Sequence, residues 1–372
     1  MINLFCIRPK GFNVGNDAIY LGMQHFIYSA FGEVVNLITL PATSRYESQA
    51  KAGLTSRTIY EINQYGHGVI IGGGNLFENG ELDVQLDALG ALEVPLMIFS
   101  VSRGRVYNRQ LELVRRTDTM PDRILKALDD RADFVLLRDE ATASHMASIG
   151  CRNTTVGACP TIYLDRMMHR LPEVPGSLDR TALISVRTPD LMSIPLEKQA
   201  RVRSDILDVL HLLRRRGHAD VRLLCHDHRD ISFAASFGDV EYIYTGDVMT
   251  YLSLLSRCAL NVTYRLHSFL PCVSFGRPTI KISYDERALS LIDTVGLGPW
   301  NINMIEEPDV GAAVRDRLDR LDELPQLRRS NALLWERFYG QFDATFRSFS
   351  AAVQAYHDRV ESRRPSGLRI AA

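Results

Sequence analysis

The chain has 372 residues, of which 46% are hydrophobic and 23% are charged, and its formal net charge is −1. This length supports two domains with their own cores, and the near-zero charge excludes broad binding to a polyanion such as nucleic acid. No hydrophobic run approaches the ~20 residues that span a bilayer, and residues 1–10 lack the features of a signal peptide. We therefore expect a cytoplasmic protein, which could lie at the inner face of the membrane.

Strands alternate with helices along the first half of the chain. Strands are predicted at residues 2–7, 34–40, 67–71, 95–101, 133–137 and 154–156, and helices at 18–31, near the end of 43–64, at 121–131 and at 141–149. Repeated alternation of this kind indicates a doubly wound sheet of parallel strands. In such sheets, ligands bind beyond the carboxyl ends of the strands.

The alternation restarts after a segment that has no clear period and contains two prolines. Further strands are predicted at 181–186, 221–225, 241–244, 261–264 and 278–283, and helices at 197–216, 248–256, 269–275 and 326–362. This pattern divides the chain into an N-terminal α/β domain (1–165), a linker (166–180), a C-terminal α/β domain (181–308), C-terminal helices (309–364) and a disordered tail (365–372). The two sheets are expected to face each other across a cleft, with the long C-terminal helix packing back on the first domain.

Glycine-rich loops follow two strands of the first domain. The loop at 8–17, which contains Gly15, has neither the Walker nor the GxGxxG spacing, so it is not a P-loop. The other strand ends in three glycines, including Gly73 and Gly74, followed by Asn75. The first loop would let backbone N–H groups approach an anion or a sugar, and the three glycines suggest that a ligand or another backbone approaches closely there. An ordinary tight turn is the alternative in both cases.

Arginines follow three predicted strands of the second domain. Arg187, Arg265 and Arg287 lie just beyond the strands at 181–186, 261–264 and 278–283. The guanidinium group stays charged and binds carboxylate or phosphate with two parallel hydrogen bonds. His267 lies two residues after Arg265, near a helix start, where it could exchange a proton near neutral pH. These residues together favour a site for a small anionic molecule.

The remaining polar motifs have simpler explanations. His226 and His228 alternate around Asp227 as zinc ligands can, but no third ligand is identifiable, so a capping or cleft-lining role is preferred. Asp139 and Glu140 precede a helix and fit an N-cap. The six cysteines form no CxxC pair, which favours small buried side chains in a reducing compartment. We therefore predict no metal site.

Several segments together resemble the polysaccharide pyruvyl transferases, over roughly residues 5–300. The matching segments are Tyr264-Arg265-Leu266-His267-Ser268, Gly276-Arg277-Pro278, Tyr284-Asp285-Glu286-Arg287, Asn13-Val14-Gly15-Asn16-Asp17-Ala18, Gly72-Gly73-Gly74-Asn75, Leu137-Arg138-Asp139-Glu140 and Ile184-Ser185-Val186-Arg187. The sequence departs from the family pattern at four positions. Asn16 stands where Asp is usual, Asp17 where Glu is usual, Arg287 where Lys is common, and Cys159 where an Asp is frequent.

The resemblance implies a fold of two domains similar to that of GT-B glycosyltransferases. It also implies transfer of the pyruvyl group of phosphoenolpyruvate to two hydroxyls of one sugar, which gives a cyclic ketal and phosphate. The saccharide acceptor could be lipid-linked and would belong to exopolysaccharide or cell-envelope synthesis. The first domain would be the acceptor side and the second the donor side, with phosphoenolpyruvate as a substrate and no cofactor.

The resemblance also assigns roles to residues. Arg187, Arg265 and His267 would be catalytic, with protonated His267 as the general acid. The base is left open between Asp17 and Asp139. Substrate binding would involve Asn13, Gly15, Asp17, Gly73, Gly74, Asn75, Tyr284 and Arg287.

Two other functions remain open at this point. The first is a GT-B glycosyltransferase that uses a nucleotide sugar, for which Glu286 is the nearest candidate to bind a ribose. The second is a non-catalytic carbohydrate-binding protein, in which the arginines and the histidine would have no chemical role.

Overall fold

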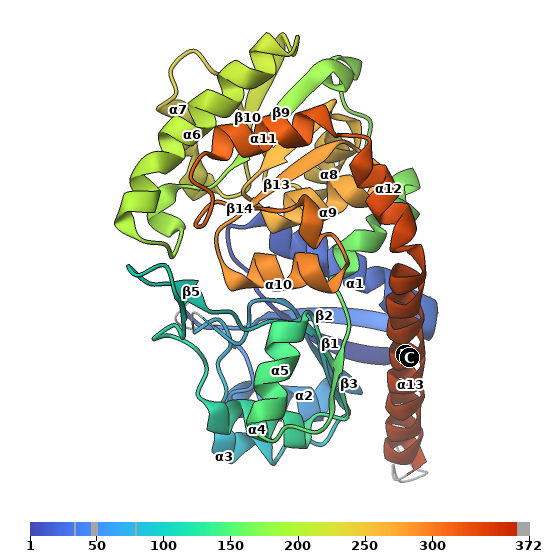
Figure 1. Ribbon diagram of the computed structural model, residues 1–372. Coiled ribbons are helices and arrows are strands. Elements are labelled where there is room, and N and C mark those ends of the chain that lie inside the picture. The colour runs from blue at the N-terminus through green and yellow to red at the C-terminus, as the bar shows by residue number, and fades with distance from the viewer. Residues whose placement is uncertain (33–34, 46–50, 79, 363–372) are drawn as a thin grey trace.

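A computed structural model describes residues 1–32, 35–45, 51–78 and 80–362. Within this part of the chain, two six-stranded parallel sheets lie one above the other (Figure 1). The first contains β1 (Ile2–Arg8), β2 (Val35–Pro41), β3 (Gly68–Gly74), β4 (Leu96–Val101), β7 (Phe134–Leu137) and β8 (Thr154–Val156), in the order β2-β1-β3-β4-β7-β8. The second contains β9 (Thr181–Val186), β10 (Asp220–Cys225), β11 (Tyr242–Tyr244), β12 (Leu260–Thr263), β13 (Thr279–Ser283) and β14 (Ile302–Asn303), in the order β11-β10-β9-β12-β13-β14. The two doubly wound sheets predicted from the sequence are confirmed.

Each sheet has one point at which the strand order reverses. In the first sheet it lies between β1 and β3, and in the second between β9 and β12. Loops leave the sheet in opposite directions at such a point and open a crevice beyond the strand ends. The residues that follow these four strands are therefore in position to form a site.

Helices connect the strands of both sheets. They are α1 (Val14–Phe31), α2 (Ser56–Tyr65), α3 (Leu86–Leu89), α4 (Asp122–Arg131), α5 (Glu140–Ser148), α6 (Leu196–Arg215), α7 (Ile231–Ala235), α8 (Val248–Arg257), α9 (Leu266–Ser274) and α10 (Glu286–Thr294). Helix α9 begins directly after Arg265, three residues before the predicted start, so the first turn of this helix carries His267. Between the sheets, Pro160–Arg170 and Gly176–Arg180 form 3₁₀ helices. The division of the chain into domains stays a prediction.

Several elements differ from the sequence-based expectation, including the helices α3, α7 and α10, which were not predicted. The strand β14 and the antiparallel pair β5 (Val106–Tyr107) and β6 (Leu113–Val114) were not predicted, because two-residue strands give no readable alternation. The long helix predicted at 326–362 is wrong at its start. It is divided into α12 (Glu323–Ser330) and α13 (Ala332–Ser362), preceded by α11 (Val310–Asp319). The side-chain amide of Asn331 donates to the carbonyls of Gly296 and Leu327, which ends α12.

The helix α13 runs along one side of the first domain (Figure 1). It buries a stripe of aromatic residues at helical spacing, Phe338, Phe342, Phe346 and Phe349. The ring of Phe346 lies 4.9 Å from that of Phe99 on β4 and 5.8 Å from that of Phe26 on α1. The C-terminal helix therefore completes the core of the first domain, as expected from the sequence.

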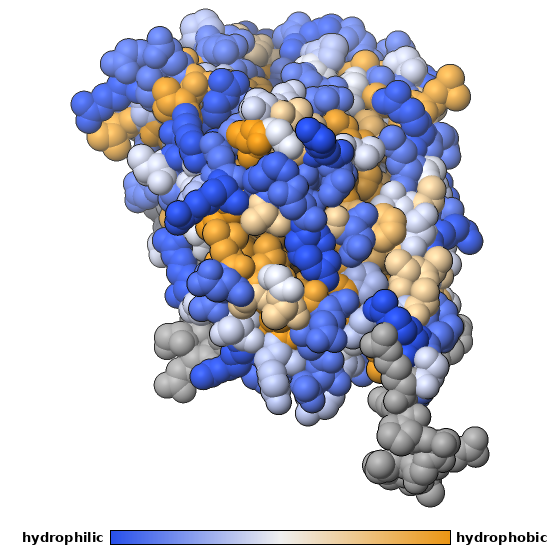
Figure 2. Space-filling view, turned by 90° about the horizontal axis from the view of Figure 1, so that it is seen from below, coloured by the Kyte–Doolittle hydropathy of each residue, from blue (hydrophilic) through white to orange (hydrophobic). Residues whose placement is uncertain are grey.

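Most of the outer surface is polar. Figure 2 shows hydrophilic residues over most of the face seen from below, with hydrophobic residues gathered near its middle. None of the helices in the described ranges is long and apolar enough to cross a membrane. Val34, residues 46–50 of the predicted helical region and the predicted tail lie outside the described residues.

Replacing Phe346 by alanine is expected to lower the free energy of unfolding by about 3–5 kcal/mol, because the ring is fully buried among other aromatic rings. Denaturant unfolding of the full chain measures this loss. Tyr60 on α2 is 69% exposed and provides a control, since its replacement by alanine is expected to change stability by less than about 1 kcal/mol. Equal losses in the two variants would contradict the packing role of α13.

Candidate active site

A cavity of about 460 Å³ lies where the carboxyl ends of both sheets meet. Its wall includes seven of the eleven residues predicted to be catalytic or substrate-binding: Asn13, Asn75, Arg187, Arg265, His267, Tyr284 and Arg287. Gly15, Asp17, Gly73 and Gly74 are described residues but do not line it. Residues from both domains thus line one cavity.

Arg187 and Arg265 lie side by side because of the strand register. Thr263 of β12 pairs with Ser185 of β9, and each arginine follows two residues later, at the point where the strand order reverses. Arg265 is 7% exposed, its Nε donates to the carbonyl of Val186 at 3.0 Å, and its Nη2 pairs with Asp230. Two of the three guanidinium nitrogens of Arg265 are therefore engaged by the protein and are not available to a ligand.

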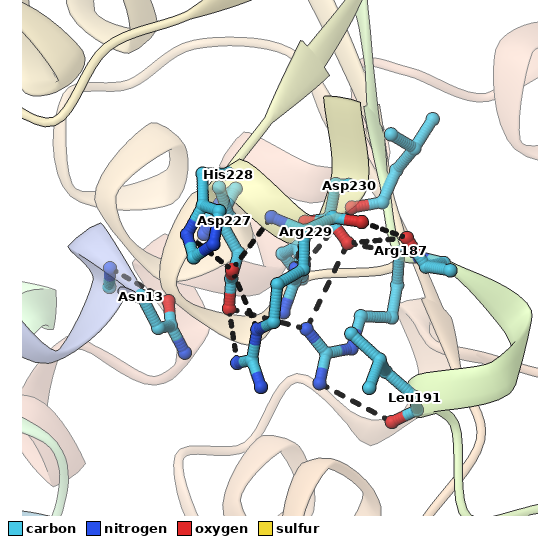
Figure 3. Close-up of polar contacts among 12 residues, drawn as sticks. Asn13, Arg187, Leu191, Asp227, His228, Arg229 and Asp230 are labelled. Carbon is cyan, nitrogen blue, oxygen red and sulfur yellow. Dashed lines mark hydrogen bonds and ion pairs between the residues drawn. The ribbon is translucent and has the colours of Figure 1, made fainter. Parts of the chain in front are cut away.

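Arg187 is held more loosely. Its Nη2 donates to the carbonyl of Leu191 at 3.3 Å, and its Nη1 lies 3.7 Å from Asp227 and 3.8 Å from Asp230 (Figure 3). Its Nε and Nη1 are buried without a hydrogen-bond partner among the described residues. Burial, and then the nearby charge of Arg265, lower the pKa of Arg187 to about 10. An anion in the cavity would supply the missing acceptors.

His267 lies partly exposed in the first turn of α9, with its Nε2 lacking a hydrogen-bond partner among the described residues. Burial, and then the charges of Arg138 and Arg287, hold its pKa well below the usual value of 6.5. The neutral imidazole is therefore the favoured form in the empty cavity at pH 7. Gly15 lies against this ring, since a Cβ on Gly15 would be 2.9 Å from the Cβ of His267. The absence of a side chain at Gly15 therefore leaves room for His267, and Gly15 itself does not line the cavity.

Arg287 joins the two domains at the cavity. Its side chain pairs with Asp285, and its Nη1 lies 3.4 Å from the carboxylate of Glu78, which follows β3 of the first domain. Arg116 approaches the other oxygen of Glu78 at 3.8 Å. Glu78 is 1% exposed, neither oxygen has a hydrogen bond within the described chain, and burial raises its pKa to about 7 against the opposing effect of Arg287.

The raised pKa of Glu78 predicts a pH-dependent stability. Because the folded state holds this proton at pH values where the unfolded state has lost it, the group lowers stability as pH rises from about 4.5 to about 7. The variant Glu78→Gln lacks this titration. Between pH 5 and pH 8 it is expected to gain stability relative to the wild type, by an amount on the order of 3 kcal/mol. Denaturant unfolding at both pH values checks this, and a constant difference between the two proteins would contradict it.

Arg138 and Arg116 also line the cavity, although the sequence analysis gave them no role there. Arg138 directly follows β7 and is 2% exposed, and its Nε lacks a hydrogen-bond partner among the described residues. Its position at a strand end is the same signal that identified Arg187, so the sequence could have revealed it. Arg116 is held by Asp118 at 2.8 and 3.0 Å and donates to Ser193 of the other domain at 2.8 Å. It lies in an irregular segment that gives no such signal.

The predicted residues of the first domain have mixed roles. Asn13 lines the cavity and caps α1, accepting from the backbone N–H of Gly15 at 3.0 Å. Asp17 pairs with Arg8 at 2.6 Å outside the cavity wall. Gly73 has a φ of +79°, and a Cβ there would lie 2.1 Å from Ile19 of α1, so this glycine allows the close approach of that helix.

The other polar motifs behave mainly as structural groups. Asp139 is buried and caps α5, accepting from the N–H of Thr142 at 3.0 Å, which confirms the N-cap prediction. His226 hydrogen-bonds Tyr251, whereas the ring of His228 lies 4.3 Å from that of Phe12. Within the described ranges, no group of three or more His, Cys, Asp or Glu residues is placed to hold a metal ion.

The family model for polysaccharide pyruvyl transferases matches residues 13–286. The chain belongs to the polysaccharide pyruvyl transferase family. The match spans most of the chain and includes the loop at Asn13 and the strand ends at Arg138, Arg187 and Arg265. Membership of the pyruvyl transferase family supports a transferase that acts on a saccharide. Comparison with curated proteins found no significant match.

Solved structures share the fold at low sequence identity. MnaA from S. aureus, in a co-structure with UDP, is 14% identical, with a TM-score of 0.53 over 97% of this chain and 96% of that chain. The UDP-GlcNAc 2-epimerase of Methanocaldococcus jannaschii, in complex with UDP-GlcNAc and UDP, is 12% identical, with a TM-score of 0.53 over 85% of this chain and 92% of that chain. These likenesses confirm the GT-B-like arrangement of two domains expected of a pyruvyl transferase of this family.

Proposed function

We propose that the protein transfers the pyruvyl group of phosphoenolpyruvate to two hydroxyls of one sugar, in a polysaccharide or its precursor. The observation that carries the proposal is Arg187, whose two buried nitrogens lack hydrogen-bond partners beside His267 in the cavity of a pyruvyl transferase family member. Phosphoenolpyruvate carries a carboxylate and a phosphate, and a guanidinium group can bind either with two hydrogen bonds.

The first step would make the enol carbon electrophilic. The methylene carbon takes a proton from the imidazolium of His267, and a sugar hydroxyl oxygen forms a bond to the neighbouring carbon as its own proton leaves to a base. The product is a tetrahedral ketal that still carries the phosphate. Arg187, Arg265 and Arg138 would stabilise the anionic groups in this state.

The second step would close the ring. The bond between this carbon and the phosphate oxygen breaks, and phosphate leaves with the electron pair. The second hydroxyl oxygen then bonds to the carbon and gives up its proton. Of the two hydroxyl protons, one replaces the proton that His267 gave to the methyl group, and the other leaves with the phosphate. Neither Asp17 nor Asp139 lines the cavity, so neither is in a position to be the base without a change in structure.

The donor itself would prepare His267 for this role. Burial, and then the neighbouring guanidinium groups, hold the pKa of His267 well below its usual value, which favours the neutral imidazole. A bound phosphoenolpyruvate brings at least two negative charges among the same groups, which favours the imidazolium form. Proton delivery would therefore follow donor binding rather than precede it.

The first-domain wall of the cavity suits a sugar. Phe12, Asn13, Asn16 and Asn75 line this side and offer one aromatic ring and three amide groups. We place the saccharide acceptor here, lipid-linked or free, as part of exopolysaccharide or cell-envelope synthesis.

The position of Glu286 argues against the alternative of a glycosyltransferase, for which this residue was the candidate to bind a ribose. Both carboxylate oxygens of Glu286 accept hydrogen bonds from Arg105 of the first domain, at 2.8 Å from the backbone N–H and 2.8 Å from Nε. Glu286 also lies outside the cavity wall. It fastens the two domains together and is not available to a ribose.

Thermal unfolding with different ligands tests the proposal. Phosphoenolpyruvate at 100 times its dissociation constant is expected to stabilise the full chain by about 2.7 kcal/mol. UDP and GDP are expected to give no comparable effect, and inorganic phosphate serves as a control for simple anion binding. Stabilisation by a nucleotide alone would replace the proposal with a glycosyltransferase, and stabilisation by none of these ligands would also contradict it.

A further inference from the structure

A second cavity, of about 320 Å³, lies between α9, α12 and the start of α13. Its wall combines apolar residues with three arginines. The apolar residues are Val273, Pro278, Leu321, Leu324, Pro325 and Ala332. The arginines are Arg277, Arg328 and Arg329, and no acidic residue of the described chain is part of the wall. We refer to this cavity as the basic groove.

The basic groove is separate from the active site. The helix α9 begins at the active-site cavity with Leu266 and His267, and its other end carries Val273, so about 10 Å of helix lies between the two sites. The strand β13 likewise starts beside Pro278 at the groove and ends at the active-site cavity. The groove is thus at the opposite edge of the second sheet and does not depend on the proposed reaction.

The arginines place positive charge around an apolar interior. Arg277 donates from Nε to the carbonyl of Ser256 at 2.5 Å, and Arg328 lies 3.6 Å from Asp165 and over the ring of Trp335. Arg329 is exposed in the last turn of α12. The chain as a whole has a formal net charge of −1, so this positive charge is a local feature.

An exposed leucine adjoins the groove. Leu333 is 87% exposed in the first turn of α13, next to Ala332 of the groove wall. In Figure 1 this turn lies at the outer side of the molecule, where α12 meets α13. Exposed apolar side chains beside arginines are typical of surfaces that enter the headgroup region of a bilayer, where the arginine stems stay apolar and the heads reach the phosphates.

We propose that the basic groove and Leu333 dock the protein on an anionic lipid surface. An acyl chain would occupy the apolar interior, Leu333 would insert beside it, and the three arginines would contact headgroup phosphates. The charge of the wall favours an anionic surface. Arg328 is paired with Asp165, but Arg277 and Arg329 form no ion pair within the described residues, and a purely apolar partner would leave their charges uncompensated.

Sedimentation of the full chain with lipid vesicles at 0.15 M salt tests this proposal. The protein is expected to sediment with vesicles that contain phosphatidylglycerol and to remain in solution with phosphatidylcholine alone. Arg329→Gln is expected to weaken the partition roughly fivefold, since one arginine near an anionic surface is removed. Leu333→Asp is expected to weaken it about tenfold or more, since an apolar contact is replaced by a charge that the surface repels.

Matched controls come from another helix. Leu196 is 72% exposed in the first turn of α6, and Arg214 is exposed in its last turn. Leu196→Asp and Arg214→Gln are expected to leave the partition unchanged. Equal sedimentation with both kinds of vesicle, or equal losses in the control variants, would overturn the proposal. Thermal stabilisation by free dodecanoate without vesicle binding would also overturn it and assign the groove to a soluble single-chain ligand.

Discussion

Arg187→Gln is expected to weaken the binding of phosphoenolpyruvate by about 10²–10⁴-fold. Its Nε and Nη1 are the buried guanidinium nitrogens that an anionic donor would satisfy, and charge-assisted hydrogen bonds contribute about 1.5–3 kcal/mol each. Glutamine keeps a polar but shorter side chain, and it removes the charge and the paired N–H donors of the guanidinium group. Isothermal titration with phosphoenolpyruvate measures the effect without any knowledge of the acceptor.

The control for this variant is Arg222→Gln. Arg222 lies on β10 of the same sheet and pairs with Asp220 outside the active-site cavity. It is expected to bind phosphoenolpyruvate like the wild type. A dissociation constant for Arg187→Gln within threefold of the wild-type value would remove Arg187 from the donor site.

His267→Ala is expected to lose 10²–10⁴-fold in turnover, which is the usual contribution of a general acid. Phosphate release from phosphoenolpyruvate in the presence of a saccharide acceptor measures this loss. His211, which is exposed on α6, provides the control, since His211→Ala is expected to keep full activity. Turnover of His267→Ala within tenfold of the wild type would exclude His267 as the acid.

The pH dependence of kcat and kcat/KM distinguishes a general acid at position 267 from a histidine with only a structural role. The free protein holds the pKa of His267 well below 6.5, so kcat/KM is expected to fall with rising pH through that low value. The bound donor raises the pKa, so the corresponding fall in kcat is expected at higher pH. Identical pH profiles for kcat and kcat/KM would contradict the activation of His267 by the donor.

Position beyond a strand end was the most informative sequence signal. It placed Arg187, Arg265 and Arg287 in one cavity because parallel strands bring their carboxyl ends to the same edge. The same signal applied to the first domain would have identified Arg138, which follows β7. Sequence could not show that Arg265 is engaged by Asp230, because this pair joins residues from two different loops.

The glycine-rich loops were harder to interpret from the sequence. Three successive glycines at the end of β3 indicated a close approach, but the group that approaches Gly73 is Ile19 of α1 rather than a ligand. Glu78, four residues after Gly74, gave no signal, because its position depends on Arg287 of the other domain. Local patterns therefore predicted the strands well and the contacts between domains poorly.

The position of α13 has a consequence for synthesis on the ribosome. The strands of the first sheet are complete once Val156 has emerged, but the faces of Phe26 and Phe99 that contact Phe342 and Phe346 stay uncovered until α13 is made. At about 5–20 residues per second, the nascent first domain waits on the order of 10–40 s for these rings. During that interval it exposes a hydrophobic face, so chains released before α13 is made are expected to aggregate or to bind chaperones.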